Sequence, residues 1–332
     1  MLTIRENLLE TIHGGHPDRF VNQYEAFKML NTPLNLHDHN PKYGEENVVN
    51  AWGVTRSWPE GTPGPFPVHT PDKIVIKDIT RWREYVHAPS LDFPEEEWET
   101  FVKAAEAVDR TQYFATFFCA PGVLEQCHHL GEIQATMMNF YEEPEAMHEL
   151  IDYLTEYELR LAARVCKYLK PDALFHHDDW GSQTSTFISP AMFEEFLLPA
   201  YKQIYGYYKS HGVELVVHHS DSYAATLVPY MIEMGIDIWQ GVMTTNNIPE
   251  LIRKYGGKIS FMGGIDSASV DRPDWNREMV AREVKRACDE NGKLYFIPCA
   301  TQGLGISTYE GVYETTSEEI ARYSKIAFAS QT

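Results

Sequence analysis

The chain has 332 residues, and its 28 Lys and Arg against 48 Asp and Glu leave a formal net charge of −20 with histidine neutral. This acidic excess repels polyphosphate, so it excludes the basic face with which binding to nucleic acid or to an anionic membrane normally begins. Hydrophobic residues make up 43% and charged residues 23%. These fractions are ordinary for a globular protein, and no run approaches the roughly 20 apolar residues of a membrane span.

The first 15 residues form a polar amphipathic stretch without the long apolar core or small-residue cleavage site of a secretory signal. Five cysteines are scattered along the chain without a CxxC pair, a pattern typical of reduced thiols. We therefore expect a cytoplasmic protein.

Residues 31–73 are rich in Pro, Gly, Asn, Trp and His and show little periodicity. A segment of this length without regular elements is either disordered or functional, and its tryptophans Trp52 and Trp58 argue against disorder. We predict a long decorated loop that covers the mouth of the barrel predicted from the residues that follow.

From residue 110 onward, short β-rich runs alternate with longer stretches of helical periodicity. Six runs are predicted to be strands: Tyr113–Cys119, Ala173–Asp179, Glu214–Asp221, Asp237–Gly241, Lys258–Asp266 and Leu294–Cys299. Apolar residues at three- and four-residue spacing, with glycine at several ends, predict helices over residues 144–169, 190–212, 223–235, 248–257 and 276–292.

This alternation predicts a parallel sheet, because parallel neighbours need a crossover and the crossovers here are helices. Closure into a (β/α)₈ TIM barrel accounts for the length. A doubly wound open sheet is the alternative, but no GxGxxG loop follows any predicted strand. We expect one domain over residues 1–332, in which residues 1–110 supply an N-terminal helix and active-site loops and residues 111–332 supply the βα repeats.

The carboxyl ends of the predicted strands are unusually polar, and in a barrel these ends form the catalytic face. They carry His176 to Trp180, His218 to Asp221, Trp239 with Gln240, Gly263 to Asp266, and Pro298 with Cys299. Each of these also has a structural interpretation, since one of Asp178 and Asp179 can cap the following helix and a lone cysteine usually packs in a core. Because His218 and His219 point to opposite sides of a strand, only one of them is expected in the site.

His219, Asp221 and Cys299 together suggest a zinc site. They offer one imidazole, one carboxylate two residues further along the same strand face, and one thiolate from a later strand. Zinc accepts N, O and S donors and keeps a position open when it is catalytic. An HxD spacing is common by chance, so the three residues alone do not establish the metal.

Several segments resemble the uroporphyrinogen decarboxylase superfamily, and in particular its divergent branch of methyltransferases that act with corrinoid proteins. They are RENLLETIHGGHPDRF, APGVLEQCHHLG, DDWGSQTSTFISPAMFEEFLLPAYKQI, HHSDSYAATLVPYMIEMGIDIWQG and FMGGID. The resemblance runs almost from end to end and implies the (β/α)₈ barrel of that superfamily.

The zinc-dependent methyltransferases of this branch usually hold the metal with an HxC on one strand and a cysteine near the last strand. Here His219 matches the histidine, Asp221 stands where the first cysteine is expected, and Cys299 lies near the second. Related enzymes that take methyl groups from methoxylated aromatics vary these ligands, so the resemblance allows Asp221 as a substitute and Glu125 as an additional ligand.

The resemblance implies a methyltransferase that removes a methyl group from a methoxylated aromatic compound and passes it to the Co(I) corrinoid of a partner protein. Zinc would activate the ether oxygen, and Asp178, Asp179 and His177 are the candidate catalytic groups. Flat substrates favour aromatic pockets. The predicted substrate-binding residues are accordingly Trp52, Trp58, Trp180, Trp239, Gln240 and His37. Core packing is the alternative for at least two of the tryptophans.

No DxHxxG-type cobalamin segment is present in the chain, so the corrinoid is expected on a transient partner, and relatives are often homodimers. One alternative is a decarboxylase of a uroporphyrinogen-like tetrapyrrole. The arginine-rich RQxGRY-type segment of the true decarboxylases is missing, and the first 60 residues hold only Arg5, Arg19 and Arg56. A non-catalytic barrel that binds a corrinoid or a tetrapyrrole is the other alternative.

Overall fold

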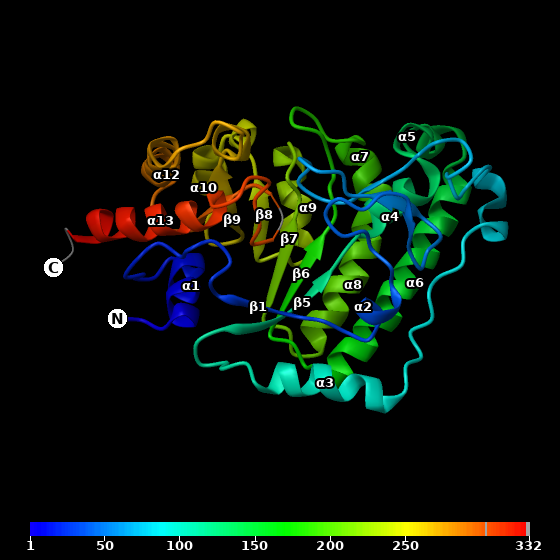
Figure 1. Cartoon of the computed structure of the whole chain (residues 1–332), viewed down its shortest axis with the longest axis horizontal. Helices are drawn as coiled ribbons and strands as arrows, with labels where there is room; N and C mark the ends of the chain where they lie inside the picture. The colour runs from blue at the N-terminus through cyan, green and yellow to red at the C-terminus, as the bar shows by residue number, and fades with distance from the viewer. Residues whose placement is uncertain (303, 330–332) are drawn as a thin grey trace.

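The computed structural model describes residues 1–302 and 304–329. Its centre is a curled sheet of seven parallel strands in the order β1-β5-β6-β7-β8-β9-β10, with helices packed against its outer face (Figure 1). The strands are β1 (Phe27–Leu30), β5 (Phe114–Cys119), β6 (Ala173–His177), β7 (Leu215–His219), β8 (Ile238–Val242), β9 (Ser260–Ile265) and β10 (Phe296–Ala300). All six predicted strands are confirmed, with ends within two residues of the prediction, and β1 is the strand that the sequence did not reveal.

The five helices that the apolar spacing predicts after residue 140 are present, but α11 and α13 in that part of the chain were not predicted, and further helices precede them. The α-helices are α1 (Ile4–His13), α2 (Leu34–His37), α3 (Glu95–Glu106), α4 (Val123–Gly131), α5 (Ile133–Glu142), α6 (Pro144–Tyr168), α7 (Pro190–Met192), α8 (Leu198–Ser210), α9 (Val228–Glu233), α10 (Ile248–Tyr255), α11 (Ser267–Val270), α12 (Arg277–Asn291) and α13 (Val312–Phe328). Short 3₁₀ turns cover Ile79–Glu84, Ala225–Leu227 and Thr244–Asn246, and a π turn covers Phe193–Leu197 between α7 and α8. None of the helices in the described part of the chain has the length and apolar character needed to cross a bilayer.

The sheet has the sequential strand order of a (β/α)₈ barrel, but the hydrogen-bonded sheet of the described residues has seven strands and does not close. Its edges, β1 and β10, do not pair with each other. Side chains bridge the seam instead: Gln23 Oε1 accepts from Ala300 N at 3.3 Å, and the Tyr24 hydroxyl donates to Gln302 O at 3.1 Å. The predicted eighth strand is missing because residues 31–113 form α2, α3, a 3₁₀ turn and a separate small sheet.

Alternate residues of the strands belong to two separate cores, as period-two geometry requires. One core fills the interior of the curled sheet and includes Phe175, Val217, Met262 and Cys299. The other lies between the sheet and the helices and includes Leu174, Val216, Trp239 and Phe261. His177 and His219 continue the inward series of β6 and β7, whereas His176 and His218 continue the outward series.

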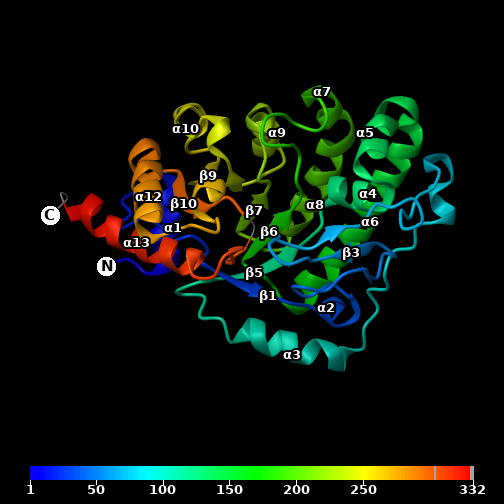
Figure 2. The same cartoon turned by 45° about the horizontal axis from the view of Figure 1, so that its top comes forward.

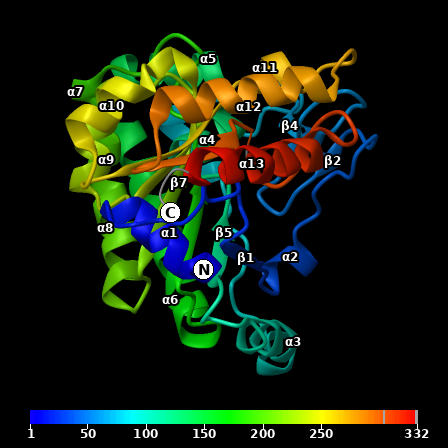
Figure 3. The ribbon, with the colours of Figure 1, turned by 90° about the vertical axis from the view of Figure 1, so that its left-hand side faces the viewer.

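The predicted loop region contains the short antiparallel strands β2 (Val48–Val49), β3 (Thr55–Ser57) and β4 (Phe66–Pro67) (Figure 2). Hydrogen bonds connect this loop region to α4. His69 Nε2 lies 3.1 Å from His129 O, and the amides of Val75 and Ile76 donate to Leu130 O. The small sheet therefore lies beside the helix that follows β5. The first and last helices, α1 and α13, lie on the same side of the molecule (Figure 3).

Candidate metal centre

Two imidazoles stand side by side at the carboxyl ends of β6 and β7. The parallel register pairs His177 with His219, and their rings stack at 4.1 Å with an interplanar angle of 21°. Asp179 follows β6, and its Oδ1 lies 3.6 Å from His219 Nε2. The ligand atoms of these three residues lie within 4.8 Å of one another.

The hydrogen bonds around Gln240 determine which nitrogen of His219 is free. Gln240 Nε2 faces the carbonyl oxygens of Ala300 and Gln302, both at 3.4 Å, so the amide nitrogen must be the donor there. Its Oε1 then accepts from His219 Nδ1. The lone pair of His219 is therefore on Nε2, the nitrogen that faces Asp179, and two acceptors that face each other need a cation or a proton between them.

His219 is suited to be a metal ligand because its imidazole is neutral. Burial lowers the pKa of His219 to about 3, and the neighbouring His177 acts in the same direction. A neutral imidazole whose other nitrogen is held by a fixed acceptor is the usual form of a ligating histidine.

His177 is held by a carboxylate rather than by an amide. Its Nδ1 lies 2.8 Å from Glu125 Oε2, which leaves Nε2 for a ligand. Burial opposes the charge of His177, but Glu125 outweighs it and raises the pKa of His177 to about 9. The same pairing outweighs the effect of burial on Glu125 and lowers the pKa of that carboxyl. Glu125, predicted as a further ligand, thus lies behind His177.

Three carboxyl groups crowd this end of the sheet. The Asp221 amide donates to Asp179 Oδ1 at 3.0 Å. Burial and the charge of Glu125 raise the pKa of Asp179 to about 6, and burial and Asp179 raise the pKa of Asp221 well above its ordinary value. Such mutual repulsion is relieved when a cation binds.

Asp178, a predicted catalytic residue, is fully buried and has both oxygens engaged. It accepts from the amides of Leu124 and Glu125 at 3.1 and 2.7 Å, from Trp180 Nε1 at 2.9 Å, and from the Tyr201 hydroxyl. Burial raises the pKa of Asp178 to about 7. The structure thus places Asp178 at the N-terminus of α4 and brings Asp179 into the site.

The predicted zinc set of His219, Asp221 and Cys299 is not assembled. Among the described residues, the groups of close potential ligands do not include this trio. The physical reason is Gln240, whose carbonyl takes His219 Nδ1 and whose amide nitrogen lies 4.0 Å from Cys299 Sγ. Cys299 is fully buried in the inner core, and burial raises the pKa of its thiol.

The aromatic residues predicted to bind substrate are not gathered at one cavity. Trp180 and Trp239 are fully buried, with indole N–H groups that donate to Asp178 and to Ser220 O. Trp58 donates to Thr62 O within its own loop, and His37 pairs with Glu97 of α3 at 2.7 Å. Trp52 lines a cavity beside α6. Gln240, also predicted to bind substrate, is fully buried against His219.

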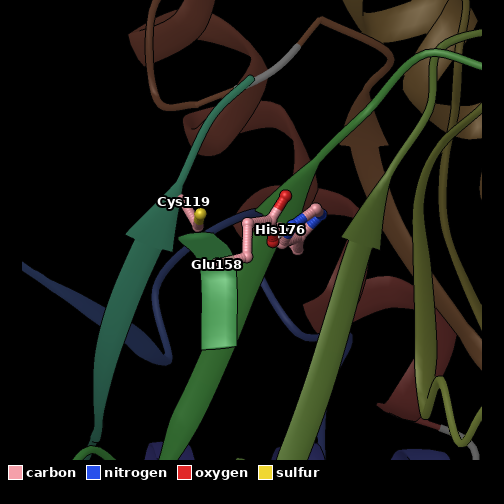
Figure 4. Close-up of side chains that lie close together, drawn as sticks. All are labelled: Cys119, Glu158 and His176. Atoms are coloured by element: carbon pink, nitrogen blue, oxygen red, sulfur yellow. Dashed lines mark hydrogen bonds and ion pairs between the residues drawn. The ribbon is translucent and has the colours of Figure 1, made fainter. Parts of the chain in front are cut away.

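Two further groups of potential ligands lie outside this centre, and the sequence analysis did not identify them. Glu125, His128 and His129 meet on α4. Cys119, Glu158 and His176 meet between the sheet and α6, where His176 Nε2 lies 2.8 Å from Glu158 Oε2 (Figure 4). The alternation within His176-His177 indicates an outward imidazole, but nothing in the sequence identifies Glu158 as its partner.

A metal ion fits the centre formed by His177, Asp179 and His219 on the chemistry of its donors. Two imidazoles and one carboxylate are ligands that zinc accepts, and three protein ligands leave a position for substrate. Each imidazole is oriented through its Nδ1, by Glu125 or by Gln240. Fold and site together define an α/β protein with a curled parallel sheet and a candidate metal centre at the carboxyl end of its strands.

The family model of uroporphyrinogen decarboxylase (URO-D) matches residues 94–302, and the chain belongs to this family. The structure is similar to a methyltransferase from Methanosarcina mazei, with 14% identity, a TM-score of 0.66, and coverage of 97% of this chain and 99% of that one. A B12-independent methionine synthase from Shewanella sp. W3-18-1 matches with 13% identity, a TM-score of 0.42, and coverage of 77% and 74%. No curated protein matches the sequence.

Proposed function

We propose that this protein is a methyltransferase that takes a methyl group from a methoxylated aromatic compound and passes it to the Co(I) corrinoid of a partner protein. The observation that carries the proposal is the convergence of His177, Asp179 and His219 at the carboxyl end of the sheet, within 4.8 Å of one another. Membership of the URO-D family and the full-length similarity of fold to a methyltransferase support it.

The group that these three residues would hold is zinc. When bound, zinc would act as a Lewis acid toward the ether oxygen, which is otherwise a poor leaving group. The amide of Gln240 keeps the Nε2 lone pair of His219 available, and Glu125 fixes the ring of His177.

The proposed proton donor is Asp221. Burial and the neighbouring Asp179 raise the pKa of Asp221 well above its ordinary value, and its side chain is only partly buried. The proton would pass to the aryl oxygen as its bond to the methyl group breaks. The tryptophan side chains of the N-terminal loops remain proposed contacts for the aromatic ring.

A decarboxylase acting on a porphyrinogen is the weaker candidate. Such a substrate carries many carboxylates and needs cationic partners. Arg5 is paired with Asp172 and Glu214, which precede β6 and β7 and so lie at the opposite end of the strands, and Arg19 is paired with Asp18. The candidate metal centre is instead surrounded by the carboxyl groups of Glu125, Asp179 and Asp221.

The remaining parts of the proposal concern partners and organisation. We propose that the corrinoid arrives on a transient partner protein, that the chain works as a single cytoplasmic domain, and that residues 1–110 supply loops to the mouth of the site. A homodimer is compatible with this organisation.

The test is an assay of methyl transfer to reduced cobalamin. A panel of methoxyaromatic donors is incubated with the protein, and the loss of Co(I) absorbance is followed. At least one donor is expected to react, and His219→Ala is expected to lower the rate about 100-fold or more because it removes a metal ligand.

His211→Ala is the matched control. His211 is an exposed histidine after α8 that bonds within its own helix, so the variant should keep the wild-type rate. Failure of every donor, together with release of CO₂ from a porphyrinogen, would replace this proposal with the decarboxylase.

A further inference from the structure

A cavity of about 80 Å³ lies outside the sheet, between β5, α6 and the segment from residue 34 to residue 56. It is separate from the interior that contains His177 and His219, since Cys119 of β5 faces outward. Its wall includes Trp52, Arg56, Cys119, Gln126, Tyr157 and Glu158.

Three polar atoms of this wall are buried without a hydrogen-bond partner among residues 1–302 and 304–329: Arg56 Nε, Gln126 Nε2 and the Tyr157 hydroxyl. Gln126 and Tyr157 are each 5% exposed. An unpaired buried donor costs about 1–3 kcal/mol, so such groups are normally paired. Three of them on one cavity point to a ligand that supplies acceptors.

The chemistry of the three groups indicates an anion. Each of them donates: a guanidinium N–H, an amide N–H and a phenol O–H that burial keeps protonated by raising the pKa of Tyr157. The other nitrogens of Arg56 are engaged by Asn40 Oδ1 at 2.6 Å and Pro65 O at 2.9 Å, both uncharged. Burial lowers the pKa of Arg56 and outweighs the opposing effect of the charges of Glu125 and Asp38.

The acidic groups of the wall are already occupied. Glu158 accepts from His176 at 2.8 Å, and Figure 4 shows the two side chains together. Asp38 accepts from the amide of Ala51 and from Asn40 Nδ2, both at 2.8 Å. These carboxylates do not take up the three free donors.

The volume limits the size of the ligand. A cavity of roughly 150 Å³ encloses benzene, so this smaller cavity suits a ligand smaller than benzene. Leu34, Leu154 and Leu161 give it an apolar side. We propose that this cavity binds a short aliphatic carboxylate, whose oxygens accept from Arg56, Gln126 and Tyr157 while its alkyl end contacts the leucines.

The test uses sodium propionate as the probe, measured by calorimetric titration of the full chain. Propionate is expected to bind saturably, and propionamide, which has the same size without the charge, to bind about tenfold more weakly or less. Benzoate, which exceeds the cavity, should also bind more weakly than propionate.

Two variants test the residues. Tyr157→Phe removes only an unpaired hydroxyl, so it should weaken propionate binding about fivefold without lowering the Tm. Arg56→Gln should weaken it about tenfold or more. Tyr141→Phe, at an exposed tyrosine of α5, is the matched control and should bind as the wild type does.

The proposal is overturned if propionate does not bind, if propionamide or benzoate binds as tightly, or if both variants bind like the wild type. His219→Ala separates this site from the proposed reaction, because it should abolish methyl transfer and leave propionate binding unchanged. Carboxylate binding can therefore stand even if the proposed function fails, and the reverse also holds.

Discussion

At the residue scale, the candidate metal centre depends on which nitrogen of each imidazole is left free. Strand alternation predicts that His219 points inward and His218 outward, and the structure agrees. The sequence does not predict that Gln240 turns its carbonyl to His219 and its amide to Ala300 O, because that choice is made by backbone groups of another strand. For the same reason, the spacing of His219, Asp221 and Cys299 in the sequence could not show whether these residues meet.

The two aspartates after β6 have different roles, and the sequence alone does not show which aspartate has which role. Asp178 accepts from four donors around the start of α4, whereas Asp179 faces His219. Asp178→Ala leaves these donors unpaired in a dry site, so we expect the free energy of unfolding to fall by about 3 kcal/mol or more. Urea unfolding followed by circular dichroism measures this change.

Asp274→Ala serves as the control for that measurement. Asp274 is exposed and pairs with Arg272, so its loss should change the stability by less than about 0.5 kcal/mol. If Asp178→Ala is as stable as Asp274→Ala, the account of Asp178 as a structural residue is wrong.

At the scale of elements, periodicity predicted the helices α6, α8, α10 and α12 and the six strands from β5 onward, but not the long helix α13. It failed for β1, a strand of four residues, and for the two- and three-residue strands of the small sheet. Strands this short contain too few residues for alternation to be visible. Their pairing is decided by tertiary contacts, such as those of residues 69–76 with α4.

The start of α4 is packed closely against the end of β6, and Gly122 makes this approach possible. A Cβ at this position would lie 2.5 Å from Asp178 Cβ and 2.7 Å from His176 Cε1. Gly122→Ala should therefore lower the free energy of unfolding by about 1 to 3 kcal/mol through overpacking. The measurement is again urea unfolding.

Gly206→Ala is the control, because a Cβ at Gly206 meets no neighbouring atom. Gly206 lies in α8 with open space around its Cα, so alanine should raise stability by up to about 1 kcal/mol. If the Gly122→Ala variant is as stable as the wild type, α4 can move away from β6 at little cost. The close packing at Gly122 would then not fix the position of Glu125, which lies on α4.

At the scale of the whole molecule, the fold class was predictable because alternating strands and helices leave few topologies. The open seam was not predictable, since it results from the absence of one strand and from the side chains of Gln23 and Tyr24 that bridge β1 and β10. Parallel register then brings together His177 and His219, which lie on different strands.

The metal content of the purified protein tests the central claim most directly. Elemental analysis is expected to find about one zinc per chain in the wild type and none in His177→Ala or His219→Ala. His129→Ala, in the neighbouring group with Glu125 and His128, and Cys299→Ala should both retain the metal. Zinc that persists in His219→Ala, or that disappears only in His129→Ala or Cys299→Ala, would contradict the account.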